Sequence, residues 1–594
     1  MLNRGMPRLV RVFSRVHPGL TALVVGVGFF QGLLLPAFTI ATGALAAALD
    51  DDRSPMGAVV AIGVLFTLQR ILDPVTAEAG EVLMRRVDER MTERVMTALA
   101  LPPGLAHIED PTVLDAATQA QGALTGVTPG SAAVQLPYLV KRLVWLLASL
   151  AIVGSYRWWL VLVLGVVYAG VFRFQRDHFH DVTQVMHGSA DALRRVYYLR
   201  TLALTHTVAK ETRVFGLAPW FVDRYRSEWL TVMRGIWSRR REHWPQIVGL
   251  AAALVVVEGV AFALVADDVV DGRLRVGLAV AVAQALLASA AAAQFDWAFT
   301  APTEANIALD KLDDLEARAA TAIQRLAGDR DAAGMPKATI RFDDVRFTYP
   351  GRHEPVFDGF SLDIEAGRSL AIVGENGAGK TTFVKLLARL YDPDGGRILV
   401  DDVDLRELDP VEWRKRLAPV FQDFLQLEVS AYDNVAFGNL ERRHDAGAVE
   451  AAVDTAGATP LIERLPRRWD TVLTREFSGG TQLSGGEWQR LALARAMFAV
   501  HCGAGVLVLD EPTAAMDVRG EAEVYDRFLE LTKGVTTIVI SHRFSTVRRA
   551  DRIVVVEHGR IVEDGTHDEL LALGGTYASM YRLQAARFVE SSDA

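Results

Sequence analysis

The sequence predicts a multi-domain membrane protein, in which an all-α part with six membrane helices precedes an α/β part. Hydrophobic residues make up 51% of the 594-residue chain and the mean hydropathy is +0.19, yet 23% of the residues are charged. Such values indicate that an apolar part and a charged part are averaged together. Long apolar stretches lie before residue 296, whereas short β-rich runs alternate with helical patterns from Ala338 onward. Because the chain is too long for one ordinary core, we expect two large units.

Six stretches of the N-terminal part are candidates for membrane helices. A hydrocarbon core about 30 Å thick requires roughly 20 apolar residues in a helix. The stretches that qualify are residues 20–49, 57–77, 138–155, 158–174, 247–266 and 276–295. The basic N-terminus superficially resembles a secretory signal, but the apolar run that follows it is too long for one and is followed by further such runs. We therefore interpret residues 20–49 as the first membrane helix.

The loops between these stretches alternate in charge. Short connections after residues 49 and 266 are acidic, whereas the long segments 80–136 and 175–243 are rich in arginine and lysine. Because basic loops stay on the cytoplasmic side, this pattern predicts a multi-pass protein of the cell membrane with a cytoplasmic N-terminus. The long loops also show helical patterning, so the membrane helices are expected to extend beyond the bilayer on that side. Six spans return the chain to the cytoplasm, where the second domain is expected.

The apolar part ends in a charged helical stretch, 310–326, and a polar linker, 327–337. We therefore expect a membrane domain over residues 1–335 and a second domain over 336–594. The single cysteine, Cys502, excludes an internal disulfide framework and a metal site built from cysteines. The net charge of −9 argues against a nucleic-acid-binding protein.

A glycine-rich loop in the second domain follows a β-rich run at 370–373 and opens a helical pattern at Thr381. It matches the pattern GxxxxGK[ST], in which backbone N–H groups and a helix N-terminus hold nucleotide phosphates. Lys380 is expected to reach the β and γ phosphates of ATP, and the Thr381 hydroxyl to bind Mg²⁺. A chance glycine-rich turn is the alternative, and the strand and helix on either side count against it. The loop consists of Gly374, Glu375, Asn376, Gly377, Ala378, Gly379, Lys380, Thr381 and Thr382.

An apolar run at 506–509 ends in two acidic residues. Asp510 is expected to face Mg²⁺ and Glu511 an attacking water. A strand that ends in acidic residues is common and is weak evidence by itself. The phosphate loop earlier in the chain is what makes this run indicative of a nucleotide site. Together the two motifs predict an α/β P-loop NTPase domain.

Between these motifs, residues 483–487 read Leu-Ser-Gly-Gly-Glu and resemble the signature motif of ATP-binding cassette (ABC) transporters. The resemblance extends over residues 338–580 and implies roles for further side chains. Tyr349 looks like the aromatic residue that stacks on adenine, and His542 like the switch histidine that contacts the γ-phosphate. Taken singly, a packed aromatic residue and a core histidine are the alternatives. The common order of these features along the chain favours the ABC interpretation.

Two further residues take their roles from the same resemblance. Gln422 looks like the loop glutamine that links the nucleotide to the membrane domain, and Asp517 like an aspartate of the dimer interface. The implied catalytic set is Lys380, Gln422, Glu511 and His542, and the implied metal set is Thr381, Gln422 and Asp510. The implied nucleotide-binding set adds Tyr349, Ser484, Gly485, Gly486 and Asp517 to the phosphate loop.

The resemblance also implies a dimer. In this family, ATP on one phosphate loop is completed by the signature motif of a second cassette, and this chain has one cassette. Because Lys380, Glu511 and His542 all stand at their motif positions, a homodimer is favoured over a heterodimer. Six spans ahead of a cassette resemble an exporter half-transporter. Segments 108–115 and 210–216 look like the coupling helices that dock on cassettes, and both also fit ordinary capped amphipathic turns.

The residues around the signature bear on the cargo. Residues 473–482 depart from the multidrug pattern and, with Trp488-Gln489-Arg490, look more like bacterial exporters of modified peptides such as lantibiotics. The sequence thus predicts export of a peptide, driven by ATP hydrolysis. An exporter of drugs, lipids or other hydrophobic small molecules is an alternative, as is a membrane-bound regulatory ATPase or channel. The six apolar stretches disfavour a soluble cassette protein of the translation or DNA-repair type, and the position of Cys502 excludes a leader-cleaving cysteine protease.

Glu258 is the most isolated charge within the apolar stretches. Because a charge is costly in hydrocarbon, we expect it to face a cavity, where it would bind a cationic group of the cargo. A structural ion pair with Arg70, Lys141 or Arg142 is the alternative.

Overall fold

The structure of the chain is a computed structural model that describes residues 2–122, 126–188, 190–205, 208–293, 297–511, 533–541 and 543–592. Its contacts divide the chain into two units. The first unit consists of Met1–Ala98 and Thr112–Ala317, and the second of Leu99–Pro111 and Arg318–Ala594.

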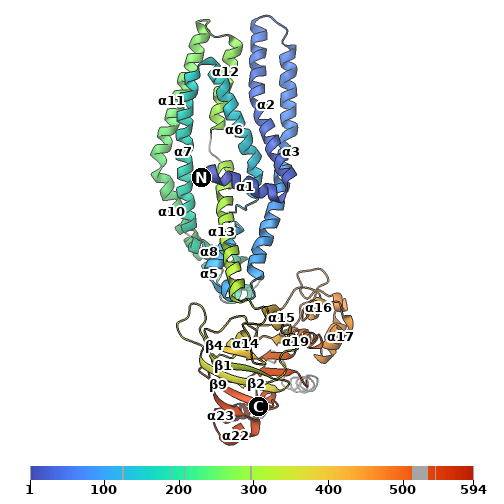
Figure 1. The fold of residues 1–594 in the computed structure, drawn as a ribbon. Helices are drawn as coiled ribbons and strands as arrows, with labels where there is room; N and C mark the ends of the chain where they lie inside the picture. Colours follow the sequence, from blue (N-terminus) through green and yellow to red (C-terminus); the bar gives the residue numbers. More distant parts are fainter. Residues whose placement is uncertain are drawn as a thin grey trace. The chain divides into compact units, whose positions relative to one another are not determined.

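The first unit is built from α-helices (Figure 1). The long helices that lie wholly or mostly in this unit are α2 (Pro18–Asp50), α3 (Met56–Ala100), α6 (Ser131–Tyr156), α7 (Trp158–Gly188), α10 (Ala218–Glu242), α11 (Trp244–Val270), α12 (Val276–Ala292) and α13 (Trp297–Arg325). Shorter helices are α1 (Leu2–Val16), α5 (Pro111–Ala120), α8 (Ala190–Leu204) and α9 (Ala209–Val214). Helices α3 and α7 continue well beyond the apolar stretches that the sequence shows, which agrees with the expected extensions.

Within the described residues, five helices are long and apolar enough to cross a membrane. They are α2, α3, α6, the Trp158–Phe179 part of α7, and α11. Helix α12 is apolar as well but has 17 residues. The sixth predicted stretch, 276–295, ends among residues 294–296, which lie outside the described residues.

Helix α2 packs closely against α6 through glycines. A Cβ atom on Gly28 would lie 2.6 Å from the carbonyl oxygen of Pro137 in α6. A Cβ on Gly32 would lie 2.6 Å from Cβ of Val144, one turn further along the same contact. Small residues at such positions let helix backbones approach closely, so that van der Waals contact stabilises helix pairs in an apolar medium.

The hydrogen-bond partner of Glu258 is Tyr168, whose hydroxyl donates to Glu258 Oε1 at 3.3 Å. Lys141 instead lies 3.3 Å from Asp73 Oδ1, and Arg142 donates to the carbonyl oxygen of Ala292. The ion pair of Glu258 with Arg70, Lys141 or Arg142 that the sequence left open is therefore not the observed contact. The Glu258 carboxyl group instead accepts a hydrogen bond from the hydroxyl of Tyr168.

The second unit contains two sheets (Figure 1). The antiparallel sheet has the order β2 (Phe357–Glu365), β1 (Thr339–Phe347), β4 (Gly395–Val400) and β5 (Val403–Asp404). The larger sheet has the order β10 (Arg560–Gly565), β9 (Arg552–Glu557), β3 (Ser369–Val373), β8 (Thr536–Ile540), β7 (Val506–Asp510) and β6 (Leu417–Val420). Its strands are parallel except for β10 at the edge, which confirms the predicted α/β class with a largely parallel sheet.

The second unit also contains helices. They are α4 (Ala106–Glu109), α14 (Lys380–Leu387), α15 (Pro410–Lys415), α16 (Ala431–Ala436), α17 (Ala446–Thr455), α18 (Thr459–Arg464), α19 (Gly485–His501), α21 (Phe544–Val547), α22 (His567–Leu573) and α23 (Thr576–Ser592). Every residue of β7 and β8 is buried, as expected for central strands that are covered on both faces. One apolar core, with Phe342, Phe383 and Trp413, lies between the sheets, and a second, with Leu491 and Leu507, lies beneath α19.

Residues Leu99–Pro111 belong to the second unit although they are distant from it in sequence. Leu105 packs against the core between the sheets, and a Cβ on Gly104 would lie 2.4 Å from Cδ1 of Leu326. The candidate docking segment 108–115 is thus divided between the units after Pro111. The predicted boundary near residue 335 stays a prediction, and contacts alone assign the residues from Arg318 onward to the second unit.

Candidate nucleotide-binding site

A pocket of about 1020 Å³ lies in the second unit, where strands β3, β6 and β7 end. Because the carboxyl ends of parallel strands meet at one edge of a sheet, loops from several strands converge there. The residues that line the pocket are Tyr349, Arg352, Val356, Val373, Gly374, Glu375, Asn376, Gly377, Gly379, Lys380, Thr381, Thr382, Gln422, Asp510, Glu511, Phe544, Met580, Leu583 and Gln584.

The glycine-rich loop between β3 and α14 forms one wall, and its glycines are required by the backbone. A Cβ on Gly374 would lie 2.2 Å from the carbonyl oxygen of Val556, which no side chain tolerates. Gly379 has φ +104°, in the left-handed region, and precedes the first residue of α14. The loop therefore keeps the shape that directs a helix N-terminus at the pocket.

Lys380 places its ammonium group inside the loop. Nζ donates to the carbonyl oxygens of Gly374 at 2.7 Å and Glu375 at 2.8 Å. Burial lowers the pKa of Lys380, and the nearby carboxylates Asp510 and Glu511 oppose this shift. A cation at this position suits the charge of nucleotide phosphates.

Asp510 ends the fully buried strand β7 next to the phosphate loop. Thr381 Oγ1 donates to Asp510 Oδ2 at 3.4 Å. Burial raises the pKa of Asp510 to about 6, the charge of Glu511 adds to this shift, and Thr381 and Lys380 oppose it. Hydroxyl and carboxylate oxygens are ligands that Mg²⁺ prefers, so Thr381 and Asp510 fit the metal that accompanies ATP.

Glu511 and Gln422 lie side by side at the end of the sheet. Gln422 Nε2 donates to Glu511 Oε2 at 3.2 Å. Glu511 has φ +49°, which is uncommon for a residue other than glycine, and its N–H donates to the carbonyl oxygen of Ile540 at 2.8 Å. Backbone strain of this kind is concentrated at functional sites, where surrounding contacts maintain it. The arrangement turns the carboxylate of Glu511 out of the sheet and toward the pocket.

Tyr349 forms another part of the wall. Its hydroxyl lies 3.1 Å from Thr382 Oγ1, and its ring meets that of Tyr391 edge to face at 5.5 Å. Lys385 Nζ lies 5.1 Å from the centre of the same ring. These contacts fix an aromatic surface beside the phosphate loop.

Replacing Tyr349 by alanine is expected to raise the KM for ATP by about 5- to 150-fold, because stacking of a base on an aromatic ring contributes about 1–3 kcal/mol. The variant Tyr349→Phe retains the ring and loses the hydroxyl contact with Thr382, so its KM should stay within about threefold of that of the unsubstituted protein. Steady-state ATPase kinetics of both variants would check this. Equal KM values for the alanine and phenylalanine variants would contradict a stacking role.

The signature residues lie apart from this pocket. Ser484 is the N-cap of α19 and forms a capping box with Glu487, which also pairs with Arg464. Ser484 and Gly485 are exposed, and of the predicted nucleotide-binding residues that the structure describes, Ser484, Gly485, Gly486 and the buried Ala378 do not line the pocket. Asp517 and His542 lie outside the described residues.

The C-terminal region contributes pocket residues that the sequence analysis did not identify. Met580, Leu583 and Gln584 come from α23, and Phe544 begins α21. Gln584 Oε1 accepts a hydrogen bond from the N–H of Phe544 at 3.1 Å, which joins the two elements. These residues form no motif, and helical periodicity alone does not distinguish a pocket wall from a core face.

Known proteins resemble this chain in sequence. Residues 357–514 match the family model described as "ABC transporter". The chain is 44% identical over 245 residues to an ATP-dependent lipid A-core flippase of Chromohalobacter salexigens, which covers 41% of either chain. It is 37% identical over 257 residues to the subtilin transport ATP-binding protein SpaT of Bacillus subtilis, covering 43% of this chain and 41% of that protein.

The structure is also similar as a whole to a solved one. A bacterial Atm1-family ABC exporter with ATP bound superposes with a TM-score of 0.72 over 97% of this chain and 99% of that chain, at 24% identity. This similarity confirms the predicted fold class. The chain spans about two fifths of the length of the curated relatives named above.

Proposed function

We propose that this chain, which joins an exporter-type helical unit to an ATPase domain of the ABC transporter family, uses ATP hydrolysis to export a molecule across a membrane. The observation that carries the proposal is the convergence of Lys380, Asp510, Glu511 and Gln422 on one pocket beside a glycine loop. The five apolar helices of the first unit support a multi-pass membrane protein. Cytoplasmic placement of the N-terminus and of the cassette follows from the basic loops and belongs to the proposal.

The residues of the pocket have complementary tasks. Bound ATP with Mg²⁺ would supply the phosphoanhydride and the metal charge, with Thr381 and Asp510 as protein ligands and Gln422 beside them. Lys380 stabilises negative charge on the phosphates. Glu511 orients a water and accepts its proton at a carboxylate oxygen, and the amide of Gln422 holds that carboxylate in place. His542 and Asp517 are proposed in the roles implied by the ABC resemblance.

The proposed assembly is a homodimer. Ser484 and Gly485 are exposed at the start of α19 and lie outside their own pocket, so they are free to complete the pocket of a second copy. A heterodimer with a related chain is the alternative. The mass of the purified protein in lipid nanodiscs distinguishes a dimer from a monomer, and copurification distinguishes the two kinds of dimer.

For the cargo we place a lipid-like or other hydrophobic molecule first, ahead of the peptide that the signature region favours. Lipid A-core flippases recur among the relatives, at up to 44% identity. A peptide cargo is the second candidate, and the similarity to a subtilin transport protein supports it. Both inferences come from relatives that match over about two fifths of their length.

Vesicles that contain the purified protein would test the function. A fluorescent phospholipid and a labelled amphipathic peptide are offered separately, and movement across the bilayer is followed with and without ATP, using Glu511→Gln as the inactive control. ATP-dependent movement of the lipid would support the first cargo, and movement of the peptide alone the second. ATP hydrolysis with no movement of either probe would argue for a regulatory ATPase instead of an exporter.

A further inference from the structure

The helix that begins at the phosphate loop, α14, has an unusual set of partners at its other end. The last carbonyl groups of a helix have no partners within the helix itself. Here the carbonyl oxygens of four successive residues, from Leu387 to Leu390, each accept a hydrogen bond from another part of the second unit. The donors belong to α15 and to the segment Leu99–Pro111.

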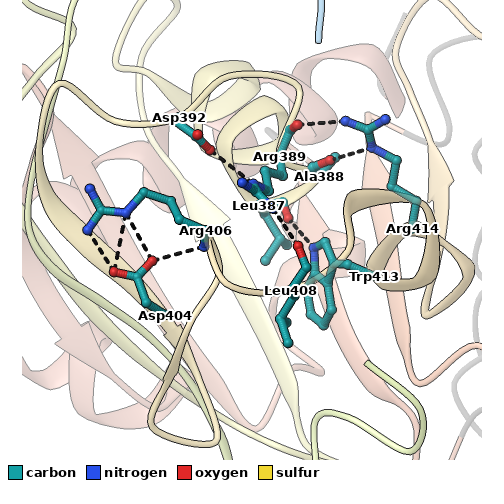
Figure 2. Close-up of polar contacts among 9 residues, drawn as sticks. All are labelled: Leu387, Ala388, Arg389, Asp392, Asp404, Arg406, Leu408, Trp413 and Arg414. Atoms are coloured by element: carbon teal, nitrogen blue, oxygen red, sulfur yellow. Dashed lines mark hydrogen bonds and ion pairs between the residues drawn. The ribbon is translucent and has the colours of Figure 1, made fainter. Parts of the chain in front are cut away.

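Helix α15 supplies the donors for the first three carbonyls, as Figure 2 shows. Trp413 Nε1 donates to the oxygen of Leu387 at 2.7 Å. Arg414 donates from Nε to the oxygen of Ala388 at 2.9 Å and from Nη2 to that of Arg389 at 2.6 Å. A guanidinium is favourable at the negative end of a helix, and its planar fork fixes two acceptors at once. Burial lowers the pKa of Arg414, as expected for a cation that has given up water for these carbonyls.

The segment Leu99–Pro111 supplies the fourth donor. The N–H of Leu105 donates to the carbonyl oxygen of Leu390 at 3.1 Å. A Cβ on Gly104 would lie 3.2 Å from the same oxygen, so the two backbones are in direct contact. Any displacement of this segment therefore acts on Leu390, which directly follows Arg389, a residue whose carbonyl oxygen accepts a hydrogen bond from Arg414.

Helix α15 is also connected to the catalytic side of the pocket. Strand β6 begins at Leu417, three residues after Arg414, and ends at Val420. Gln422 follows two residues later and donates to Glu511. Arg414 thus lies where the segment Leu99–Pro111, the phosphate-loop helix and the strand leading to Gln422 meet.

We propose that Arg414 is a positioning residue that couples the segment Leu99–Pro111 to the nucleotide pocket, by holding the C-terminal end of α14 and the start of β6 together. The inference rests on the proposed function, because it concerns how ATP binding is transmitted from the pocket. Arg414 does not line the pocket. Its substitution should therefore change the transmission of ATP binding and leave the affinity for ATP nearly unchanged.

Hydrogen exchange of the full-length protein in lipid nanodiscs tests this, in a Glu511→Gln background that retains bound MgATP. In that background, MgATP should slow exchange both in the phosphate loop and in Leu99–Pro111. Arg414→Lys retains the charge but not the two-pronged geometry, and we expect it to reduce the slowing in Leu99–Pro111 by about tenfold. The slowing in the phosphate loop should stay within about twofold. Trp413→Phe removes the indole N–H together with part of a fully buried ring, and should also reduce the slowing in Leu99–Pro111.

Arg406→Lys is the matched control. Arg406 lies near the same junction but pairs with Asp404 and makes none of the bonds to the end of α14 (Figure 2). If Arg414→Lys preserved the slowing in Leu99–Pro111 as fully as Arg406→Lys does, the coupling would be refuted while ATP binding stood. If MgATP failed to protect the phosphate loop in the background protein, the proposed function would fail and the coupling with it.

Discussion

Replacing Glu511 by glutamine is expected to slow ATP hydrolysis by about 10²- to 10⁴-fold, the range typical of a lost general base. Glutamine has almost the same shape but cannot accept a proton from water. ATP binding should survive, because the groups proposed to bind the phosphates, Lys380 and the glycine loop, remain unchanged. Single-turnover hydrolysis and equilibrium binding of labelled ATP, measured on the same sample, would separate the two effects.

The variant Glu476→Gln is a suitable control for this substitution. Glu476 is an exposed acidic residue that does not line the pocket, so the same chemical change there should leave ATP hydrolysis at its normal rate. Glu511, in contrast, directly follows β7 and bonds to Gln422. Hydrolysis by Glu511→Gln at more than about a tenth of the normal rate would contradict the assignment of Glu511 as the general base.

Replacing Asp510 by asparagine is expected to abolish Mg²⁺-dependent hydrolysis and, at neutral pH, to raise the melting temperature of the nucleotide-free protein. Burial raises the pKa of Asp510 from 3.8 to about 6. At pH values between 3.8 and about 6, the folded protein binds more protons at Asp510 than the unfolded chain does. The contribution of Asp510 to stability therefore falls as the pH rises through this window, and it stays lost above about pH 6. Asparagine does not ionise and avoids this loss.

Melting curves at pH 5 and pH 7.5, without nucleotide, would check the second effect. The increase in melting temperature that the asparagine variant shows over the unsubstituted protein should be larger at pH 7.5. The difference is about 2–4 °C for each kcal/mol that ionisation of Asp510 costs the folded protein. Asp423→Asn is the matched control, because Asp423 is a nearby but exposed acid. An equal gain at both pH values would contradict a cost of charging the buried carboxyl group.

The parts of the site that were predictable from the sequence are those built from neighbouring residues. A phosphate loop needs a strand, a turn of glycines and a helix within about fifteen residues, so its geometry follows from local chain preferences. The contact of Gln422 with Glu511 was not predictable from local sequence. It depends on β6 lying beside β7 in the sheet, and strand order is set by packing over the whole domain.

The same distinction applies to the rest of the chain. Apolar length predicted the five helices of the first unit that are long and apolar enough to cross a membrane, since a bilayer selects spans by hydrophobicity. It gave no indication of the partner of Glu258, because a tyrosine hydroxyl such as that of Tyr168 leaves no charge pattern in the sequence. The pocket residues of α23 were missed for a related reason, since Met580 and Leu583 resemble the apolar residues of any helix that packs on a core, and Gln584 belongs to no motif.

The membership of Leu99–Pro111 in the second unit limits how far the two halves of this chain are interchangeable. Leu105 and Gly104 pack against Leu326 and Leu390, which belong to the stretch after residue 317. If the residues after 317 were replaced by those of a related chain, the new ATPase domain would lack its own counterpart of Leu99–Pro111, unless that segment was exchanged as well. The chain is modular in sequence order, but its ATPase module is assembled from two separate stretches.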